Sequence, residues 1–207
     1  MLGFPNKALC SLLLLGALSS AACVGSPNPT CTGIEAAAGR CLDGGAETDA
    51  GTDSPGEPPE LAGIVSAHND ARASVDAGLP PLTWDPTLAD IARAWAAACQ
   101  DETEPAGFID HNSGRSDGYP TYVGENLFGS SEPSSAAEAV ASWMAEQVDY
   151  DYAANACSGV CGHYTQVVWK NTTRVGCAAA DCPGLTFRYT VVCNYAPGGN
   201  LGGQRPY

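Results

Sequence analysis

The stretch Gly162-His163-Tyr164-Thr165-Gln166-Val167-Val168-Trp169 decides the fold of this 207-residue chain. It is followed by Arg174-Val175-Gly176-Cys177-Ala178, and a second run, Val191-Val192-Cys193-Asn194-Tyr195-Ala196-Pro197-Gly198-Gly199-Asn200, lies near the C-terminus. β-Branched residues, glycine and cysteine recur in these runs as they do in successive strands. We therefore predict strands at 165–169, 174–180 and 187–195, with His163 just before the first.

Three helices are predicted ahead of these strands. In the first, one face at helical spacing carries Leu61, Ile64, Val65, His68, Arg72 and Val75. Asp85-Pro86 is a good N-cap and first turn for the second, whose buried stripe would be Leu88, Ile91, Ala92, Trp95 and Cys99. The third should begin near Ser134 or Ser135. Helices first and strands after predict an α+β sandwich, with His68 in its core.

The first 22 residues are typical of a secretory signal peptide. Lys7 is their only charge, and the apolar run 8–18 is too short to span a bilayer. Small residues precede Cys23, which also suits a bacterial lipoprotein signal in which Cys23 is lipidated; the alternative is cleavage after Ala22 and a soluble product. We expect a secreted or cell-envelope protein that meets a membrane only through an anchor at Cys23.

Residues 23–60 differ in composition from the rest of the chain. From Val24 to Glu60 there are seven acids against the single base Arg40, with much glycine and proline, which predicts a disordered stalk. Residues 61–207 carry sixteen acids and seven bases, and so a net charge near −9. Such a surface disfavours nucleic acid and anionic lipid. We expect one domain over 61–207 and a monomer.

The two C-terminal runs, together with Gly203-Gln204-Arg205-Pro206-Tyr207, resemble the signatures of the CAP superfamily of cysteine-rich secretory proteins, antigen 5 and plant pathogenesis-related class 1 proteins. The resemblance is closest to the plant class, in a bacterial lipoprotein-like version. It implies a three-layer α-β-α sandwich around a central antiparallel sheet. It also implies three disulfides, and leaves Cys31 to pair with Cys41 once Cys10 is removed with the signal and Cys23 is assigned to lipid. Those three pairs are Cys99–Cys182, Cys157–Cys161 and Cys177–Cys193.

Two histidines and two acids match the residues that line the central cleft of CAP domains. They are His111, Glu125, Glu146 and His163. Two neutral imidazoles beside carboxylates can bind Zn²⁺ or another divalent metal and leave a position open to water, and the ligands would be His111 and His163. The alternative is a hydrogen-bonded cluster in which each glutamate orients a histidine and no metal is bound.

Three functions from different classes remain open. The leading one is a non-catalytic binding or effector module whose cleft faces a small-molecule, lipid or protein ligand. The second is a metal-dependent hydrolase that uses water on a metal at His111 and His163, with Glu125 or Glu146 as base. The third is a precursor of a signalling peptide, because residues 197–207 resemble a tail that plant relatives release. We expect instead that this tail packs on the sandwich through Asn200 and Tyr207.

Overall fold

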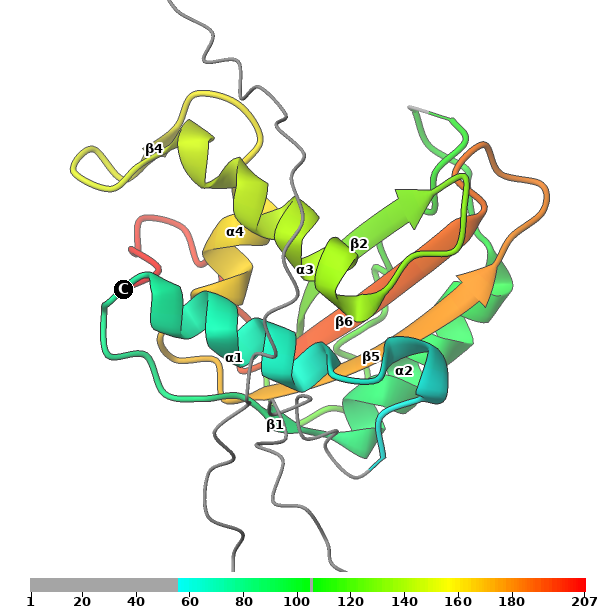
Figure 1. Ribbon diagram of the computed structural model, residues 1–207, viewed down its shortest axis with the longest axis horizontal. Helices are drawn as coiled ribbons and strands as arrows, with labels where there is room; N and C mark the ends of the chain where they lie inside the picture. The colour runs from blue at the N-terminus through cyan, green and yellow to red at the C-terminus, as the bar shows by residue number, and fades with distance from the viewer. Residues whose placement is uncertain (1–55, 105) are drawn as a thin grey trace, which may run out of the picture. The chain divides into compact units, whose positions relative to one another are not determined.

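Three layers form the domain in a computed structural model that describes residues 56–104 and 106–207 (Figure 1). The signal peptide, Cys23, the Cys31–Cys41 pair and most of the expected stalk lie outside the described residues. Along the chain the elements are η2 (Pro59–Leu61), α1 (Ile64–Ser74), β1 (Thr83–Trp84), α2 (Pro86–Ala98), β2 (Gly124–Ser130), α3 (Ala136–Ala145), η3 (Glu146–Asp149), β3 (Tyr150–Asp151), β4 (Ala156–Cys157), α4 (Gly162–Val167), β5 (Arg174–Asp181) and β6 (Tyr189–Ala196).

The central sheet has the strand order β1-β5-β6-β2. Strand β6 is antiparallel to both β5 and β2, but β1 joins β5 in parallel. The sheet is therefore antiparallel, as expected, except at this edge, where the parallel β1–β5 pair makes it mixed. Just before β1, the Asn69 side chain donates to Leu82 O (3.1 Å) and accepts from Leu82 N (2.7 Å). This clamp fixes the return path from α1 alongside β5.

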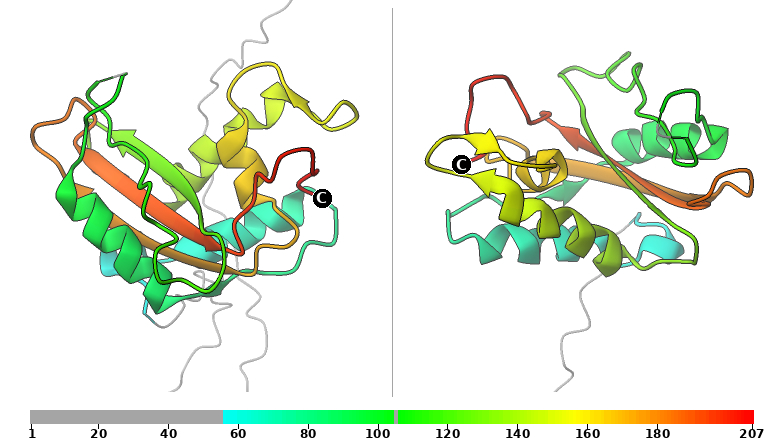
Figure 2. Two further views of the ribbon diagram at one scale, coloured as in Figure 1. Left: turned by 180° about the vertical axis from the view of Figure 1, so that it is seen from behind. Right: turned by 90° about the horizontal axis from the view of Figure 1, so that it is seen from above.

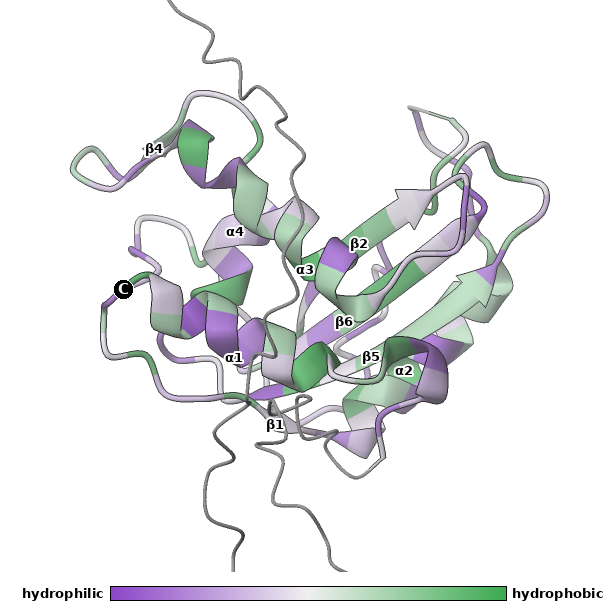
Figure 3. Ribbon diagram, in the orientation of Figure 1, coloured by the Kyte–Doolittle hydropathy of each residue, from purple (hydrophilic) through white to green (hydrophobic). Residues whose placement is uncertain are grey.

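Helices cover both faces of the sheet (Figure 2). Helices α1 and α3 pack on the face that carries Val175, Cys177 and Val191, and α2 packs on the other face, against Ala178 and Val192. The close approach of α2 depends on Gly176, because a Cβ there would lie 2.3 Å from Ala89 N. Many residues of the strands and of the helices that cover them are hydrophobic (Figure 3). Their burial in the clusters on the two faces of the sheet drives the sandwich to form.

The helix starts follow local capping. Asp85 accepts from Thr87 N and Leu88 N at the start of α2, and Ser135 forms a capping box with Glu138 at the start of α3. Helix α1 is different, because the Glu57 carboxylate accepts from Gly63 N (2.7 Å) and Val65 N (3.1 Å). Contacts of the domain therefore begin a few residues before Leu61. Within α2, the fully buried positions are Leu88, Ala89, Ala92 and Ala96, while Ile91 and Trp95 are partly exposed.

The predicted strand at 165–169 was wrong, because residues 162–167 form helix α4. The Glu146 side chain accepts from His163 N (2.9 Å) and Tyr164 N (3.3 Å), which supplies the missing partners of the first turn. The Thr165 hydroxyl donates to Cys161 O (3.1 Å), one turn earlier. A carboxylate from the end of α3 thus overrides the strand preference of Thr165 and Val167. Strand β2, by contrast, was not predicted.

Buried Arg72 joins distant segments of the chain. Its guanidinium donates to the carbonyls of Pro80, Val167, Trp169 and Thr172, and only 1% of the residue is exposed. It therefore ties α1 to the end of α4. The three disulfides that the resemblance implies, Cys99–Cys182, Cys157–Cys161 and Cys177–Cys193, are all formed. Within residues 56–104 and 106–207, no helix is both long and apolar enough to cross a membrane.

Candidate functional site

His163 is held at the start of α4 by Glu146. The ring Nδ1 lies 2.6 Å from Glu146 Oε1, while Glu146 Oε2 accepts from the backbone N–H of His163. The ring stacks on Trp143 at 6.5 Å between centroids. Burial would raise the pKa of Glu146, but the hydrogen bonds and charge of His163 and the N–H of Tyr164 outweigh it and lower that pKa. Glu146 is therefore an anion that fixes both the helix and the imidazole.

His111 has a matching partner in Glu125 of β2. The His111 Nδ1 lies 2.8 Å from Glu125 Oε1, which also accepts from Asn112 N (2.9 Å). When the Asn194 amide is oriented so that both its nitrogen and its oxygen have hydrogen-bond partners, the nitrogen donates to Glu125 Oε2 at 3.3 Å. The Glu125 side chain has no exposed surface, whereas 57% of the His111 side chain is exposed. A fixed carboxylate thus orients an accessible imidazole.

Both histidines line one cavity of about 450 Å³. Glu125 borders it as well, and Glu146 lies behind His163 without lining it. The structure therefore brings together the four residues that the sequence predicted, as two histidine–glutamate pairs facing one cleft. The lining residues are His111, Arg115, Tyr122, Gly124, Glu125, Val160, Gly162, His163, Gln166, Gly199 and Asn200.

The C-terminal tail forms one wall of this cleft. Buried Gln166 accepts from Gly199 N (2.8 Å), and Asn200 accepts from the Thr165 hydroxyl (2.7 Å) and donates to Gly162 O (2.8 Å). Gly124 is required opposite, because a Cβ there would lie 2.0 Å from Gln166 Oε1. The wall of the cleft is therefore built by hydrogen bonds between α4 and the tail.

The model of the cysteine-rich secretory protein family, CAP, matches residues 65–195. The chain belongs to the CAP family. The pathogenesis-related protein PR-1 type of Sambucus nigra is 44% identical over 147 residues, which cover 69% of this chain and 79% of that protein. GLIPR1-like protein 1 of Homo sapiens is 37% identical over 162 residues, which cover 73% of this chain and 64% of that protein.

A solved structure of a CAP relative has the same fold. The venom allergen-like protein 4 of Schistosoma mansoni is 29% identical, with a TM-score of 0.54, and the match covers 72% of this chain and 94% of that one. The predicted family and sandwich fold are thus confirmed. The family is one of secretory proteins, which agrees with the export predicted from residues 1–22.

The donors of this CAP cleft suit a divalent metal. The Nδ1 atom of each histidine is hydrogen-bonded to a carboxylate, which leaves Nε2 as the ligand atom. Such carboxylate–histidine pairs commonly orient metal-bound imidazoles and raise their basicity. Among the residues that the structure describes, no group of three or more His, Cys, Asp or Glu side chains is placed to hold a metal. A bound metal would therefore take two protein nitrogens, from His111 and His163, and fill its other positions with water or a ligand.

Several residues that line the CAP cleft could not be assigned to it from the sequence, among them Arg115, Tyr122 and Gln166. Arg115 and Tyr122 lie in the connection 112–123, where no periodic pattern indicated a site, and Gln166 was assigned to a strand. For Gln166 a signal existed, because a polar residue within the apolar run 164–169 indicates a buried hydrogen bond. His68 is fully buried, as predicted. Its Nδ1 lies 2.7 Å from Ile64 O and its Nε2 lies 2.8 Å from the Tyr195 hydroxyl. His68 does not line the cleft.

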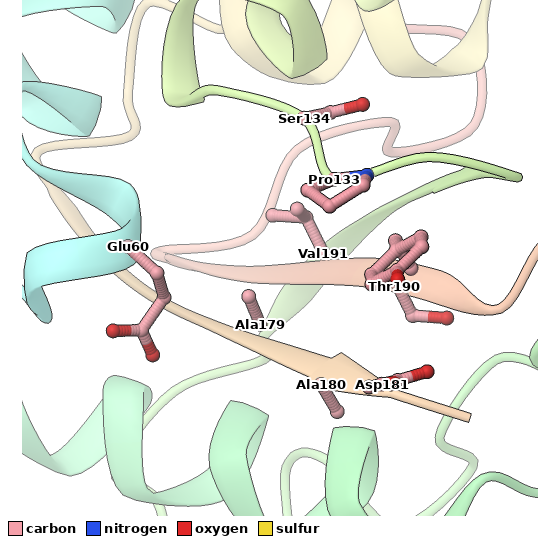
Figure 4. A pocket seen from close by; sticks show the side chains of 9 residues that line it. Glu60, Pro133, Ser134, Ala179, Ala180, Asp181, Thr190 and Val191 are labelled. Carbon is pink, nitrogen blue, oxygen red and sulfur yellow. The ribbon is translucent and has the colours of Figure 1, made fainter. Parts of the chain in front are cut away.

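A smaller hollow of about 220 Å³ lies elsewhere on the CAP domain, between the segment ahead of α3 and strands β5 and β6 (Figure 4). Its floor is largely apolar, with Ala179 and Val191, and it shares no residue with the cleft. Asp181 at its edge is paired with Arg188 at 2.6 Å. The hollow lacks the histidine–glutamate chemistry of the cleft.

Proposed function

We propose that this protein is an exported, non-catalytic binding module whose cleft binds a divalent cation through His111 and His163. The observation that carries the proposal is the pairing of each imidazole with a fixed carboxylate through Nδ1, which leaves both Nε2 atoms as ligands at one cavity. The cation's remaining positions then take a ligand from outside the cell. Zinc is the first metal to test, because it accepts imidazole nitrogen readily.

Binding is favoured over hydrolysis by the state of the two glutamates. Glu146 accepts from His163 Nδ1 and from two backbone N–H groups. Glu125 accepts from His111 and Asn112, and its second oxygen faces Asn194. A general base needs a free oxygen within reach of the proton that it takes. Both carboxylates are instead engaged in orienting groups, which makes the hydrolase the weaker alternative.

Release of a C-terminal peptide is also a weaker alternative. The tail makes hydrogen bonds through Gly198, Gly199 and Asn200, and Lys170 N donates to Pro206 O (2.7 Å). The Tyr207 ring stacks on Tyr152 with 5.0 Å between centroids. Cutting such a tail from the folded domain would break these contacts and open the wall of the cleft.

We further propose that Cys23 is lipidated, so that the domain is held at the outer side of a membrane. Small residues directly before Cys23 and the absence of large apolar residues from most of 24–60 support an anchor followed by a spacer. Cys23→Ser should move the protein from the membrane fraction to the soluble fraction. Wild-type protein that is wholly soluble in its own host would favour simple secretion.

The metal proposal is tested by zinc titration of the purified domain in a calorimeter. Wild type should bind one equivalent, and His111→Ala/His163→Ala should lose this binding. Asp70→Asn, which removes an exposed acid of α1 outside the cleft, controls for weak zinc binding by the acidic surface and should behave as wild type. Equal zinc binding by wild type and the double variant would overturn the proposal.

A further inference from the structure

Arg115 places a cation in the cleft beside the two histidines. Its Nε donates to Val123 O (2.9 Å), one terminal nitrogen donates to Asn112 O (2.7 Å), and the other donates to the Tyr122 hydroxyl (3.1 Å). The guanidinium also lies 5.7 Å from the centre of the Tyr122 ring. Three contacts to its own loop therefore fix the guanidinium in place at the edge of the cavity.

The fixed guanidinium has spare donors and no acidic partner. Of its five N–H groups, three are used in the contacts above. Among the described residues, no carboxylate lies within ion-pair distance of Arg115, although the salt bridges of Arg93, Arg174 and Arg188 are formed elsewhere. In a protein with a net charge of −14, an arginine that faces a cavity without a carboxylate is available to an anion from solution.

The charges of the cleft decide which anion fits. Glu125 and Glu146 together balance a divalent cation at His111 and His163, and the charge of Arg115 then remains. A ligand with a single negative charge neutralises the site, whereas a phosphate dianion would leave a net negative charge in a cleft of an already acidic protein. A carboxylate also matches the planar fork of a guanidinium.

The rim of the cleft indicates the rest of the ligand. Tyr122 and Val160 both line the cavity, yet 49% and 64% of these residues remain exposed. Large apolar side chains at the mouth of a cavity lose their contact with water when an apolar group covers them. The ligand should therefore carry an apolar body next to its carboxylate. A cavity of about 450 Å³ lies within the usual range for small-molecule sites.

We infer that the cleft binds an apolar monocarboxylate whose carboxyl group bridges Arg115 and the cation at His111 and His163. This inference rests on the proposed function and adds the chemical class of its ligand. Because Glu125 and Glu146 outweigh the charge of Arg115 when the cation is absent and leave the site net negative, cation and carboxylate should bind cooperatively. Arg115 is then the residue that selects acids over neutral molecules of the same shape.

The test measures binding of phenylacetate by calorimetry, with and without zinc, using the neutral phenylacetamide and inorganic phosphate as comparison probes. Zinc-loaded wild type should bind phenylacetate and should bind phenylacetamide and phosphate much more weakly. Arg115→Ala should bind zinc as wild type does but lose roughly 10- to 100-fold in affinity for phenylacetate, the usual effect of losing a charge-assisted hydrogen bond. Arg93→Ala, which removes an exposed arginine of α2, is the matched control.

The outcomes separate this inference from the proposed function. If zinc binds but phenylacetate and phenylacetamide bind equally, or Arg115→Ala leaves the affinity for phenylacetate unchanged, the inference is overturned while the metal site stands. If wild type binds no zinc, both are overturned. Arg115→Lys, which keeps the charge but not the fork, should retain an intermediate affinity for phenylacetate. Unchanged melting temperatures would show that the loop is intact in both variants.

Discussion

His68 should make the stability of this protein sensitive to mild acid. The Ile64 carbonyl can only accept a hydrogen bond, so Nδ1 carries the proton and Nε2 accepts from the Tyr195 hydroxyl. Complete burial lowers the pKa of His68 to about 4; the bond to Ile64 opposes this shift, and the nearby charge of Arg72 adds to it. The folded protein therefore keeps this imidazole neutral at pH values where the unfolded chain protonates it.

The size of the effect follows from linkage. The unfolded histidine takes up its proton near pH 6.5 and the folded one near pH 4. This contribution to stability is thus complete above about pH 6.5 and is lost progressively as the pH falls toward about 4. Each pH unit below the pKa of the unfolded histidine costs about 1.36 kcal/mol. His68 should therefore lower the free energy of unfolding by about 2 kcal/mol between about pH 7.5 and pH 5.

Urea denaturation at these two pH values measures the loss, in wild type and in His68→Gln. Glutamine offers a donor and an acceptor but does not titrate. The remaining histidines and acids are the same in both proteins, so their contributions cancel in the difference. Wild type should lose about 2 kcal/mol more than His68→Gln. Equal losses in the two proteins would refute the assignment of a buried neutral histidine.

Four further perturbations test other features. Arg72→Met removes the guanidinium that donates to the carbonyls of Pro80, Val167, Trp169 and Thr172, and it should cost about 4 kcal/mol in urea denaturation; a loss below about 1 kcal/mol would contradict its joining role. Glu146→Gln should weaken zinc binding roughly 10- to 100-fold in calorimetry, with Asp70→Asn as the matched control. Cys99→Ser and Cys182→Ser should each cost about 2–4 kcal/mol and cost no more together; additive losses would argue against this bridge. Limited proteolysis of the folded protein should leave the bond after Ala196 intact, and a cut there under native conditions would revive the peptide precursor.

Much of the fold could be predicted because periodicity and capping are local signals. Asp85 and Ser135 marked the starts of α2 and α3 correctly, and β5 and β6 lie within two residues of the predicted strands. Helix α4 could not be predicted in this way, because Glu146 completes its first turn from 17 residues away. Strand β2 contains Gly124, Asn126 and Gly129, which disfavour a strand in isolation, and pairing with β6 over its whole length stabilises it.

The candidate site likewise contains residues that the sequence predicted and residues that it did not. The sequence motifs predicted His111 and His163 with their glutamates, because these residue types carry their chemistry wherever the fold places them. Arg115 gave no such signal, since an arginine in a polar loop is ordinarily solvated. Only the backbone path of 112–123 shows that it faces the cleft. The role of a residue in such a loop can therefore be stated only once the fold is known.

The tail as a wall of the cleft has a consequence for how this protein is made. Gly199 and Asn200 leave the ribosome after every other residue that lines the cavity. The cleft can therefore close only once the tail has emerged, and a metal ion that meets the chain earlier meets an incomplete site. An affinity tag after Tyr207 should be avoided, because the carbonyl of Tyr207 is hydrogen-bonded to Tyr152 and its hydroxyl to Tyr164. A tag placed ahead of the domain leaves this last step of assembly undisturbed.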